Sequence, residues 1–375
     1  MSSRDTDHVD PTVMSERIGK PDAVDTRPSR HTMPALFQGD GEPHPPIVPA
    51  RPLPSVGMSA FWRDRRVLVT GGNGFLGSVV VRQLRDAGAH VAAPRKADYD
   101  LTQPGRADAM LAEHRPTHVI HLAARVGGIG YNQAAPAPLY LDNLLMGTHL
   151  IEATRAAEVE KTVLLGTVCS YPKFTPVPFR ESSFWDGYPE ETNAPYGIAK
   201  KALLIHAQVN AAQYGQRFAY LIPTNLFGPG DKFHPEVSHV IPALIKKCVE
   251  AKETGADKVH VWGTGAASRE YLYVEDAAAA IVLAAEVHDS PEPLNLGTNR
   301  EITIRETVET IAQVVGFTGE LVWDPTKPDG QPRRRVDAGR AEEALGWHAH
   351  MNFREGIENT VRWYLDNREL AERAP

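Results

Sequence analysis

Tyr196 and Lys200 lie four positions apart in a segment whose residue pattern predicts a helix. At this spacing the two side chains share one face of a helix. An ammonium beside a phenol favours the phenolate, which lowers the phenol pKa from about 10 towards the working range. The pair could then exchange a proton with a carbonyl group that is being reduced or formed. The structural alternative is an ordinary Tyr–Lys pair on a helix surface.

A glycine-rich turn could hold a dinucleotide. The pattern Gly72-x-Gly74-x-x-Gly77 lies between a β-rich run at 65–70 and a predicted helix at about 75–87. Glycine permits a tight turn, close approach of a pyrophosphate and close packing of the helix on the strand. The helix N-terminus adds free N–H groups. The alternative is a glycine turn without a ligand, but the strand–turn–helix context favours dinucleotide binding.

The end of the next strand bears on which dinucleotide binds. An NAD site usually has a carboxylate there, which bonds the ribose 2′-hydroxyl. Here Arg95 and Lys96 follow instead, and their charges could face the 2′-phosphate of NADP. The alternative is two turn cations without a ligand, so NADP is favoured and NAD remains open. Asp100 and Leu101 come next, where a loop could meet the adenine.

Strands and helices alternate around these residues. Further strands are predicted at 89–93, 117–124, 161–167 and 217–223, and helices at about 137–157 and 195–214. Alternation of this kind predicts parallel βαβ units and a doubly wound sheet. The second half has predicted helices at 238–253, 303–315 (opened by a Thr303–Glu306 capping box) and 353–366, and a strand at 259–262. We expect an α/β fold, a Rossmann-type doubly wound parallel sheet with a smaller α+β substrate-binding lobe over the ligand-binding edge of the sheet.

Composition excludes several classes of protein. The 375 residues are 42% hydrophobic and 23% charged, as in globular domains, and the net charge of −7 argues against a general nucleic-acid binder. Two cysteines, Cys169 and Cys248, allow no disulfide framework and no cysteine-based zinc site. The apolar run 277–285 is much shorter than the roughly 20 residues that span a bilayer. No signal sequence opens the chain, so we expect a cytoplasmic protein that binds neither membrane nor nucleic acid.

The first 60 residues differ from the rest. They contain ten of the 30 prolines and show no helical or strand periodicity. Such a segment buries too little apolar surface to offset its ordering entropy. We expect a disordered tail; a docking or targeting segment is the alternative, and Met58 is an alternative start.

Several stretches together resemble the extended short-chain dehydrogenase/reductase family over roughly residues 65–370. They are residues 124–129, 165–172, 193–196 with Lys200, 223–229, 233–235, 238–244, 269–276 and 327–330. The resemblance is greatest to family members that act on GDP-4-keto-6-deoxy-D-mannose. It implies an NADP-dependent enzyme that epimerises C3 and C5 of a GDP-sugar and then reduces C4 with a hydride. It also implies a dinucleotide-binding domain at 61–230, with returning segments at about 268–300, and a nucleotide-sugar-binding lobe at 231–267 and 301–370.

The resemblance also implies catalytic residues. The hydroxyl–Tyr–Lys triad maps onto Thr167, Tyr196 and Lys200, and an epimerising acid/base pair maps onto Cys169 and His239. Protons on carbons beside a ketone are acidic, and inversion needs a base on one face of the carbon and an acid on the other. The structural alternatives are a buried cysteine and a histidine that begins a helix.

Cofactor and substrate contacts follow from the same resemblance, and no metal site is implied. The cofactor residues are Gly71, Gly74, Phe75, Leu76, Gly77, Arg95, Lys96, Asp100, Leu101, Leu122, Ala123, Ala124, Lys200, Pro223 and His239. The substrate residues are Asn225, Lys247, Trp262, Arg269 and Lys327. The helices at 137–157 and 195–214 commonly pair in this family, which implies a homodimer.

One departure from the family pattern keeps an alternative open. Thr167 stands where the family normally has serine, and its extra methyl could alter which sugar fits. The alternative is therefore a GDP-sugar epimerase of the mannose or heptose type without net reduction. Val168-Cys169 replaces the acidic pair of the dehydratases, which disfavours dehydration. A non-catalytic dinucleotide sensor would have no use for the complete set of Thr167, Tyr196 and Lys200.

Overall fold

The computed structural model describes residues 60–127, 129–235, 238–327, 329 and 331–373. These residues all belong to one compact unit of the chain. The tail expected at 1–60, with the alternative start at Met58, lies outside the described residues except for Ala60.

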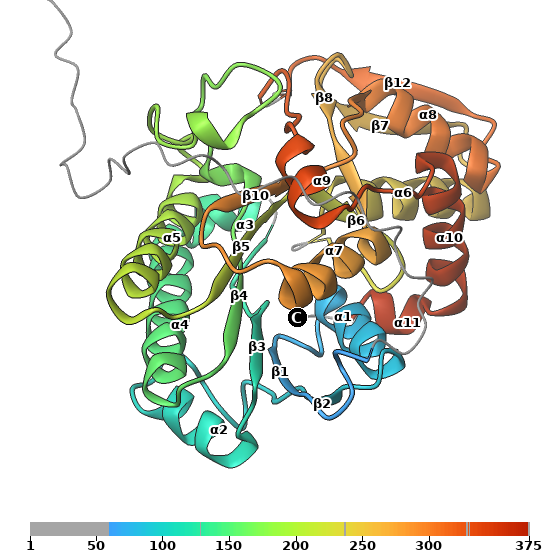
Figure 1. Cartoon of the computed structure of the whole chain (residues 1–375). Helices are drawn as coiled ribbons and strands as arrows, with labels where there is room; N and C mark the ends of the chain where they lie inside the picture. The colour runs from blue at the N-terminus through green and yellow to red at the C-terminus, as the bar shows by residue number, and fades with distance from the viewer. Residues whose placement is uncertain (1–59, 128, 236–237, 328, 330, 374–375) are drawn as a thin grey trace, which may run out of the picture. The chain divides into compact units, whose positions relative to one another are not determined.

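A parallel sheet of six strands lies at the centre, in the order β10-β5-β4-β3-β1-β2 (Figure 1). The strands are β1 (Arg66–Thr70), β2 (His90–Ala92), β3 (His118–His121), β4 (Lys161–Leu165), β5 (Phe218–Pro223) and β10 (Pro293–Leu296). Val67, Leu68 and Val69 are all buried, because helices cover both faces of such a sheet. The expected α/β fold with a doubly wound sheet is confirmed.

Two layers of helices cover the sheet (Figure 1). Alternate side chains of the strands pack on α1 (Phe75–Asp86) and α7 (Val274–Val287) on one face. On the other face they pack on α2 (Arg106–His114), α4 (Pro136–Ala156) and α5 (Ala194–Tyr214). A Cβ added to Gly147 would lie 2.2 Å from a Leu203 methyl carbon, so this glycine lets α4 and α5 pack closely.

The second half of the chain builds a separate hydrophobic core. It is formed mainly by α6 (Val240–Thr254), α8 (Ile304–Val315) and α10 (Phe353–Asp366), with the parallel pair β7 (Lys258–Trp262) and β12 (Glu320–Asp324). The predicted capping box of α8 is present, with Thr303 and Glu306 bonded reciprocally.

Short elements connect these parts. Two small sheets pair β6 (Asn225–Phe227) with β9 (Tyr271–Tyr273), and β8 (Ser268–Arg269) with β11 (Ile302–Thr303). The remaining helices are α3 (Ile129–Ala134), η2 (Val168–Ser170), η3 (Glu181–Ser183), α9 (Gly339–Leu345) and α11 (Arg368–Ala371).

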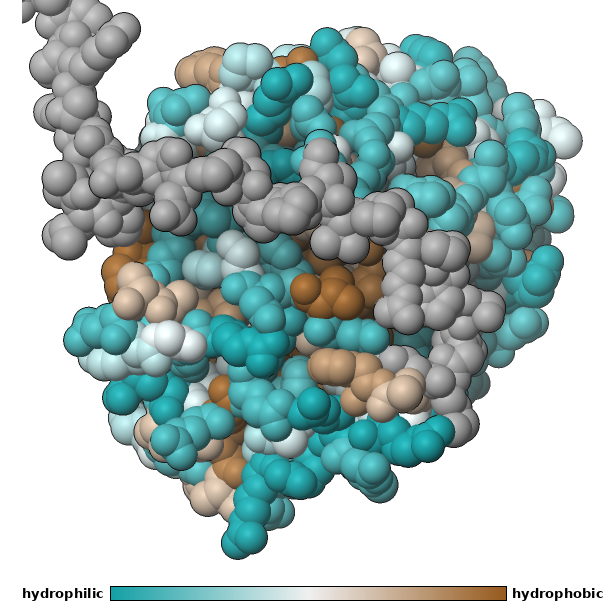
Figure 2. Space-filling model, in the orientation of Figure 1, coloured by the Kyte–Doolittle hydropathy of each residue, from teal (hydrophilic) through white to brown (hydrophobic). Residues whose placement is uncertain are grey.

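The expected elements lie within a few residues of their predicted positions, with two informative differences. The strands expected to reach residues 124 and 167 end at His121 and Leu165, because the backbone leaves the sheet there to line a cavity. The apolar run 277–285 forms the middle of the buried helix α7. None of the helices in the described ranges is long and apolar enough to cross a membrane. Hydrophilic residues predominate on the face drawn in Figure 2, and hydrophobic ones form separate small areas.

Candidate active site

The glycine turn lies where the strand order reverses. β1 has β2 on one side and β3 on the other, so loops after β1 and β3 border one crevice, the usual ligand position in such sheets. Gly71 has a φ of +71°, and a Cβ there would lie 2.7 Å from the backbone nitrogen of Ala123. A Cβ on Gly77 would lie 2.1 Å from the Gly71 oxygen. Only glycine allows these approaches, and they bring the amide groups that begin α1 to the crevice.

The two predicted cations lie on the loop that follows β2. Arg95 and Lys96 are exposed and line the cavity, and the Lys96 ammonium is 3.8 Å from an Asp100 carboxylate oxygen. The Asn73 amide donates a hydrogen bond to the Ala93 carbonyl at 2.9 Å. This bond ties the loop to the glycine turn, so both cations lie close to the turn that would hold a pyrophosphate.

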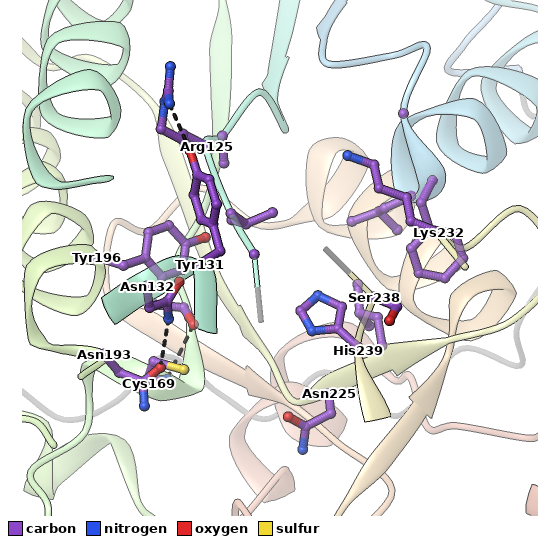
Figure 3. Close-up of a pocket in the computed structure, with 18 of the residues that line it drawn as sticks. Arg125, Tyr131, Asn132, Cys169, Asn193, Tyr196, Asn225, Lys232, Ser238 and His239 are labelled. Carbon is purple, nitrogen blue, oxygen red and sulfur yellow. Dashed lines mark hydrogen bonds between the residues drawn. The ribbon is translucent and has the colours of Figure 1, made fainter. Parts of the chain in front are cut away.

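Helix α5 packs directly on the turn that carries Cys169. A Cβ on Gly197 would lie 2.7 Å from the Cys169 oxygen, and the Ser170 hydroxyl donates to the Gly197 carbonyl at 3.0 Å. The glycine next to Tyr196 therefore lets Tyr196 and Cys169 lie on one side of the cavity, as Figure 3 shows. Thr167 begins this turn, and its hydroxyl oxygen accepts the Cys169 N–H at 3.2 Å.

Burial changes the proton affinities of Tyr196 and Lys200. Lys200 is only 2% exposed, and its Nζ lies 5.8 Å from the centroid of the Tyr196 ring. Burial lowers the pKa of Lys200 to about 8. Burial also raises the pKa of Tyr196, and the nearby Cys169 adds to this effect. The expectation of a lowered Tyr196 pKa is therefore wrong, because burial disfavours the charged phenolate.

His239 lies on the opposite side of the cavity from Cys169 and Tyr196 (Figure 3). It is the residue that precedes α6, and its ring is open to the cavity. Although the side chain is exposed to the cavity, the many protein atoms around it lower the pKa of His239 by desolvation, and the Lys232 ammonium lowers it further. A thiol and an imidazole thus face the same space from two sides.

Almost all of the predicted site residues line one cavity of about 2120 Å³. They are Gly71, Gly74, Phe75, Leu76, Gly77, Arg95, Lys96, Asp100, Leu101, Leu122, Ala123, Ala124, Thr167, Cys169, Tyr196, Pro223, Asn225, His239, Lys247, Trp262 and Arg269. Lys200 is buried next to the Tyr196 ring, and Lys327 is exposed outside the cavity lining. Cys248 is fully buried in the second core, as expected.

Trp262 also lines the cavity and is 66% exposed, with two ammonium groups near its ring. Lys247 and Lys327 lie 5.9 and 5.7 Å from the centroid of its ring. The Arg269 guanidinium donates to the Ser268 and Gln331 carbonyls, each at 2.6 Å. Burial and the charge of Arg334 lower the pKa of Arg269. A flat ring with two nearby ammonium groups, and arginines elsewhere in the cavity lining, can hold an aromatic base and a phosphorylated group.

The sequence did not single out several cavity residues. Arg125 donates to the Tyr131 hydroxyl at 2.7 Å and pairs with Asp142 at 2.7 Å. The Asn132 amide donates to Asn193 Oδ1 at 3.2 Å (Figure 3). The six-residue helix α3 that carries Tyr131 and Asn132 is too short for a periodic pattern. Arg125 and Asn193 lie inside two of the resemblance stretches, which is the signal that could have found them.

Comparisons with known proteins agree with this geometry. Residues 67–297 match the NAD dependent epimerase/dehydratase family. The GDP-L-fucose synthase 1 of Arabidopsis thaliana is 40% identical over 306 residues, which are 81% of this chain and 94% of that protein. The GDP-L-fucose synthase of Escherichia coli is 38% identical over 315 residues, 81% of this chain and 98% of that protein.

A solved structure is similar over most of the chain. The GDP-L-fucose synthetase of Naegleria fowleri bound to NADP has a TM-score of 0.76 and 30% sequence identity. The match covers 83% of this chain and 97% of that chain.

Proposed function

The chain belongs to the NAD dependent epimerase/dehydratase family, and on this premise we propose that it is an NADP-dependent epimerase–reductase that converts GDP-4-keto-6-deoxy-D-mannose to GDP-L-fucose. The observation that carries the proposal is the composition of the cavity. It combines Thr167 and Tyr196, with Lys200 buried beside the Tyr196 ring, with a thiol and an imidazole on opposite sides. The relatives and the NADP-bound structure named above support the substrate and the cofactor.

The cavity fits a dinucleotide at its glycine end. Close backbone approaches at Gly71 and Gly77 make a cradle that a Cβ would fill, and the amides of α1 face it. Arg95 and Lys96 are the residues that would hold a 2′-phosphate, because cations rather than a carboxylate follow β2. When bound, NADPH supplies the hydride for C4 of the sugar.

Epimerisation is assigned to Cys169 and His239. The base removes the proton from C3 or C5 on one face, and the other group gives a proton to the same carbon on the opposite face. The ketone at C4 accepts the negative charge that forms when the proton leaves. Their positions on two sides of the cavity suit such an exchange.

Reduction is assigned to the triad. The protonated Tyr196 donates its proton to the C4 oxygen, and its raised pKa keeps that proton available at neutral pH. The Thr167 oxygen accepts the Cys169 N–H, so its own O–H remains free to bond the sugar oxygen. The Lys200 ammonium stabilises the charge that develops on the phenol.

A second candidate is a GDP-sugar epimerase without net reduction. The extra methyl of Thr167 supports it, because this methyl could change which sugar fits the site. Purified protein with GDP-4-keto-6-deoxy-D-mannose and NADPH separates the two. We expect loss of NADPH absorbance in step with formation of a 6-deoxy sugar that has no keto group. Epimerised keto sugar formed without loss of NADPH would instead support the second candidate.

We also propose that the enzyme is a homodimer of the cytoplasm. Both free cysteines suit a reducing compartment. Helices α4 and α5 pack side by side and carry exposed apolar residues, among them Tyr140, Leu141, Val209 and Tyr214. A second copy that packed on them would cover this surface.

A further inference from the structure

Arg334 is the cationic side chain that contacts the Cys169 sulfur. Its Nη1 lies 3.7 Å from Cys169 Sγ, within the range of a hydrogen bond to sulfur, and the side chain lines the cavity. Its other partner among the described residues is Gln331, whose Oε1 accepts from Arg334 Nε at 3.1 Å. In the part of the chain that the structure describes, no carboxylate pairs with Arg334. Its charge is therefore directed at the sulfur and the cavity.

Gln331 fixes the position of this guanidinium. While its Oε1 accepts from Arg334, its Nε2 donates to the Lys173 carbonyl at 3.2 Å. Its backbone carbonyl also accepts from Arg269. One glutamine thus joins the loop that follows Cys169 to the two arginines of the second half of the chain.

The extended segment that carries Arg334 is also held two residues later, at Val336. The Val336 N–H donates to a buried oxygen of Glu270 at 2.8 Å. Val336 also forms an isolated parallel bridge with Phe179, which lies beyond the Cys169 turn in the chain. Arg334 is therefore held against Cys169 from both ends rather than lying on a free loop.

The chemistry of a thiol makes a fixed charge at this place useful. A thiol that gives its proton to a sugar carbon becomes a thiolate, and a thiolate that takes a proton becomes neutral. In both directions the charge on sulfur changes by one, and a nearby guanidinium stabilises the ionised form. The charged or titratable groups that the structure places at Cys169 are Tyr196 from α5 and Arg334.

We propose that Arg334 is a positioning residue for Cys169, held in place by Gln331: it orients the sulfur into the cavity and places a positive charge beside it. The proposal deepens the proposed function, because it rests on Cys169 as an acid or base of epimerisation. It predicts that the reactivity of Cys169 depends on the charge at position 334, with or without a sugar substrate.

Alkylation of the full-length protein tests the proposal without substrate. The chain has two cysteines, and Cys248 is fully buried with its pKa raised to about 11, so it serves as an unreactive internal reference. Iodoacetamide labelling of Cys169 is followed by peptide mass at neutral pH. Arg334→Met, which keeps length and loses charge, should slow labelling by about 3- to 10-fold. Arg334→Lys should restore much of the rate.

Faster or unchanged labelling of Cys169 in Arg334→Met would contradict the proposal. A guanidinium that only covers the sulfur would slow the reagent, so its removal would speed labelling or leave it unchanged. Either result overturns the proposal. Arg333→Met is the matched control, since Arg333 is exposed, pairs with Glu301 and lies outside the cavity lining. Its labelling rate should equal that of the unmodified protein.

Two further measurements keep the test decisive. Gln331→Met leaves the charge of Arg334 but removes its anchor, and it should slow labelling by a smaller factor; no change there removes Gln331 from the proposal. If Arg334→Met does not fold, as judged by circular dichroism, the Gln331→Met variant takes its place in the test.

With substrate, Arg334→Met should lose deuterium uptake at C3 and C5, and Arg334→Lys should recover it. A natural protein that processes no GDP-sugar would refute the proposed function, whereas the labelling result would still decide the role of Arg334.

Discussion

Burial raises the pKa of the Tyr196 phenol, and a phenol that holds its proton suits a reductase. A group that must give a proton to an oxygen has to hold that proton at the working pH. The raised pKa of Tyr196 provides this, while Lys200, with a pKa of about 8, is mainly charged at pH 7. A protonated Tyr196 beside the Lys200 ammonium can therefore give its proton to a carbonyl oxygen that is being reduced.

Replacement of Tyr196 by phenylalanine should separate the two chemical steps. Loss of the proton donor is expected to lower the rate of NADPH oxidation by about 10²- to 10⁴-fold. Deuterium uptake from heavy water at C3 and C5 should continue, because Cys169 and His239 remain. NADPH absorbance measures the reduction, and mass spectrometry of the sugar measures the deuterium uptake. Tyr188→Phe is the control, since Tyr188 is exposed and lies outside the cavity lining; equal losses in both variants would contradict the role of Tyr196.

Arg95 should determine the preference for NADPH over NADH. Removal of a charged hydrogen bond to a phosphate typically weakens binding by about tenfold or more. Arg95→Ala should therefore raise the KM for NADPH by roughly tenfold, and the addition of Lys96→Ala should raise it further. NADH lacks the 2′-phosphate and is the internal control. An equal rise in the KM for NADH would mean that Arg95 shapes the loop and does not contact the 2′-phosphate.

Single residues also show where sequence reasoning ends. The glycine turn and the Tyr–Lys pair were predictable because each chemistry is carried by neighbours in the chain. Cys169 and His239 lie 70 positions apart and came only from the resemblance. Arg334 is 165 positions from the sulfur that it contacts, and no local pattern connects them.

At the scale of elements, the contact between α4 and α5 supports the catalytic helix. Glu152 of α4 accepts hydrogen bonds from Asn210 Nδ2 at 2.9 Å and from His206 Nε2 at 2.8 Å, both on α5. The bond from Asn210 is the main favourable cause that lowers the pKa of Glu152 to about 2, and His206 and Arg155 contribute. The charged carboxylate therefore helps to hold the helix that carries Tyr196 and Lys200.

The pH dependence of stability should report this carboxylate. Its folded pKa lies below its unfolded value, so its contribution is present above about pH 4.5 and is lost as the pH falls towards about 2. Glu152→Gln should lower the urea midpoint at pH 7, and the difference from the unmodified protein should shrink between pH 4.5 and pH 3. Glu309→Gln, at an exposed position of α8, should show no such trend. A difference that stayed constant with pH would contradict the ionic role of Glu152.

Element prediction succeeded where a segment was long and patterned. Helices α4 and α5 begin and end within a residue of their predicted bounds, and the glycine turn fixed the start of α1. Strands such as β6, β8 and β11 have two or three residues, so they carry no periodic pattern of their own. Tertiary pairing alone makes them strands, and these are the strands that border Asn225 and Arg269 in the cavity.

For the whole molecule, the exposed side of α4 and α5 predicts assembly. Leu141 is 50% exposed on α4, beside other apolar residues of that surface. A dimer should be seen by light scattering, and Leu141→Asp should convert it to a monomer, because a charge buried in an interface without a partner is costly. Leu365→Asp, at a leucine 52% exposed on α10, is the matched control and should stay dimeric. A natural protein that is monomeric at micromolar concentration would refute the proposed dimer.

The arrangement of the whole chain was predictable in outline. Alternating strands and helices implied the doubly wound sheet, and the irregular second half implied a further core. The single cavity that both halves line forms because loops of different lengths meet over the edge of the sheet. No single stretch of sequence specifies how those loops meet.

The most direct test of the account follows both steps in one reaction. Purified protein, GDP-4-keto-6-deoxy-D-mannose and NADPH are mixed in heavy water, and the product sugar is analysed by mass spectrometry and NMR. The account predicts that NADPH is consumed in equal amount to the product, which carries deuterium at both C3 and C5 and a hydride-derived hydrogen at C4. A product reduced at C4 without deuterium at C3 and C5 would contradict the paired roles of Cys169 and His239.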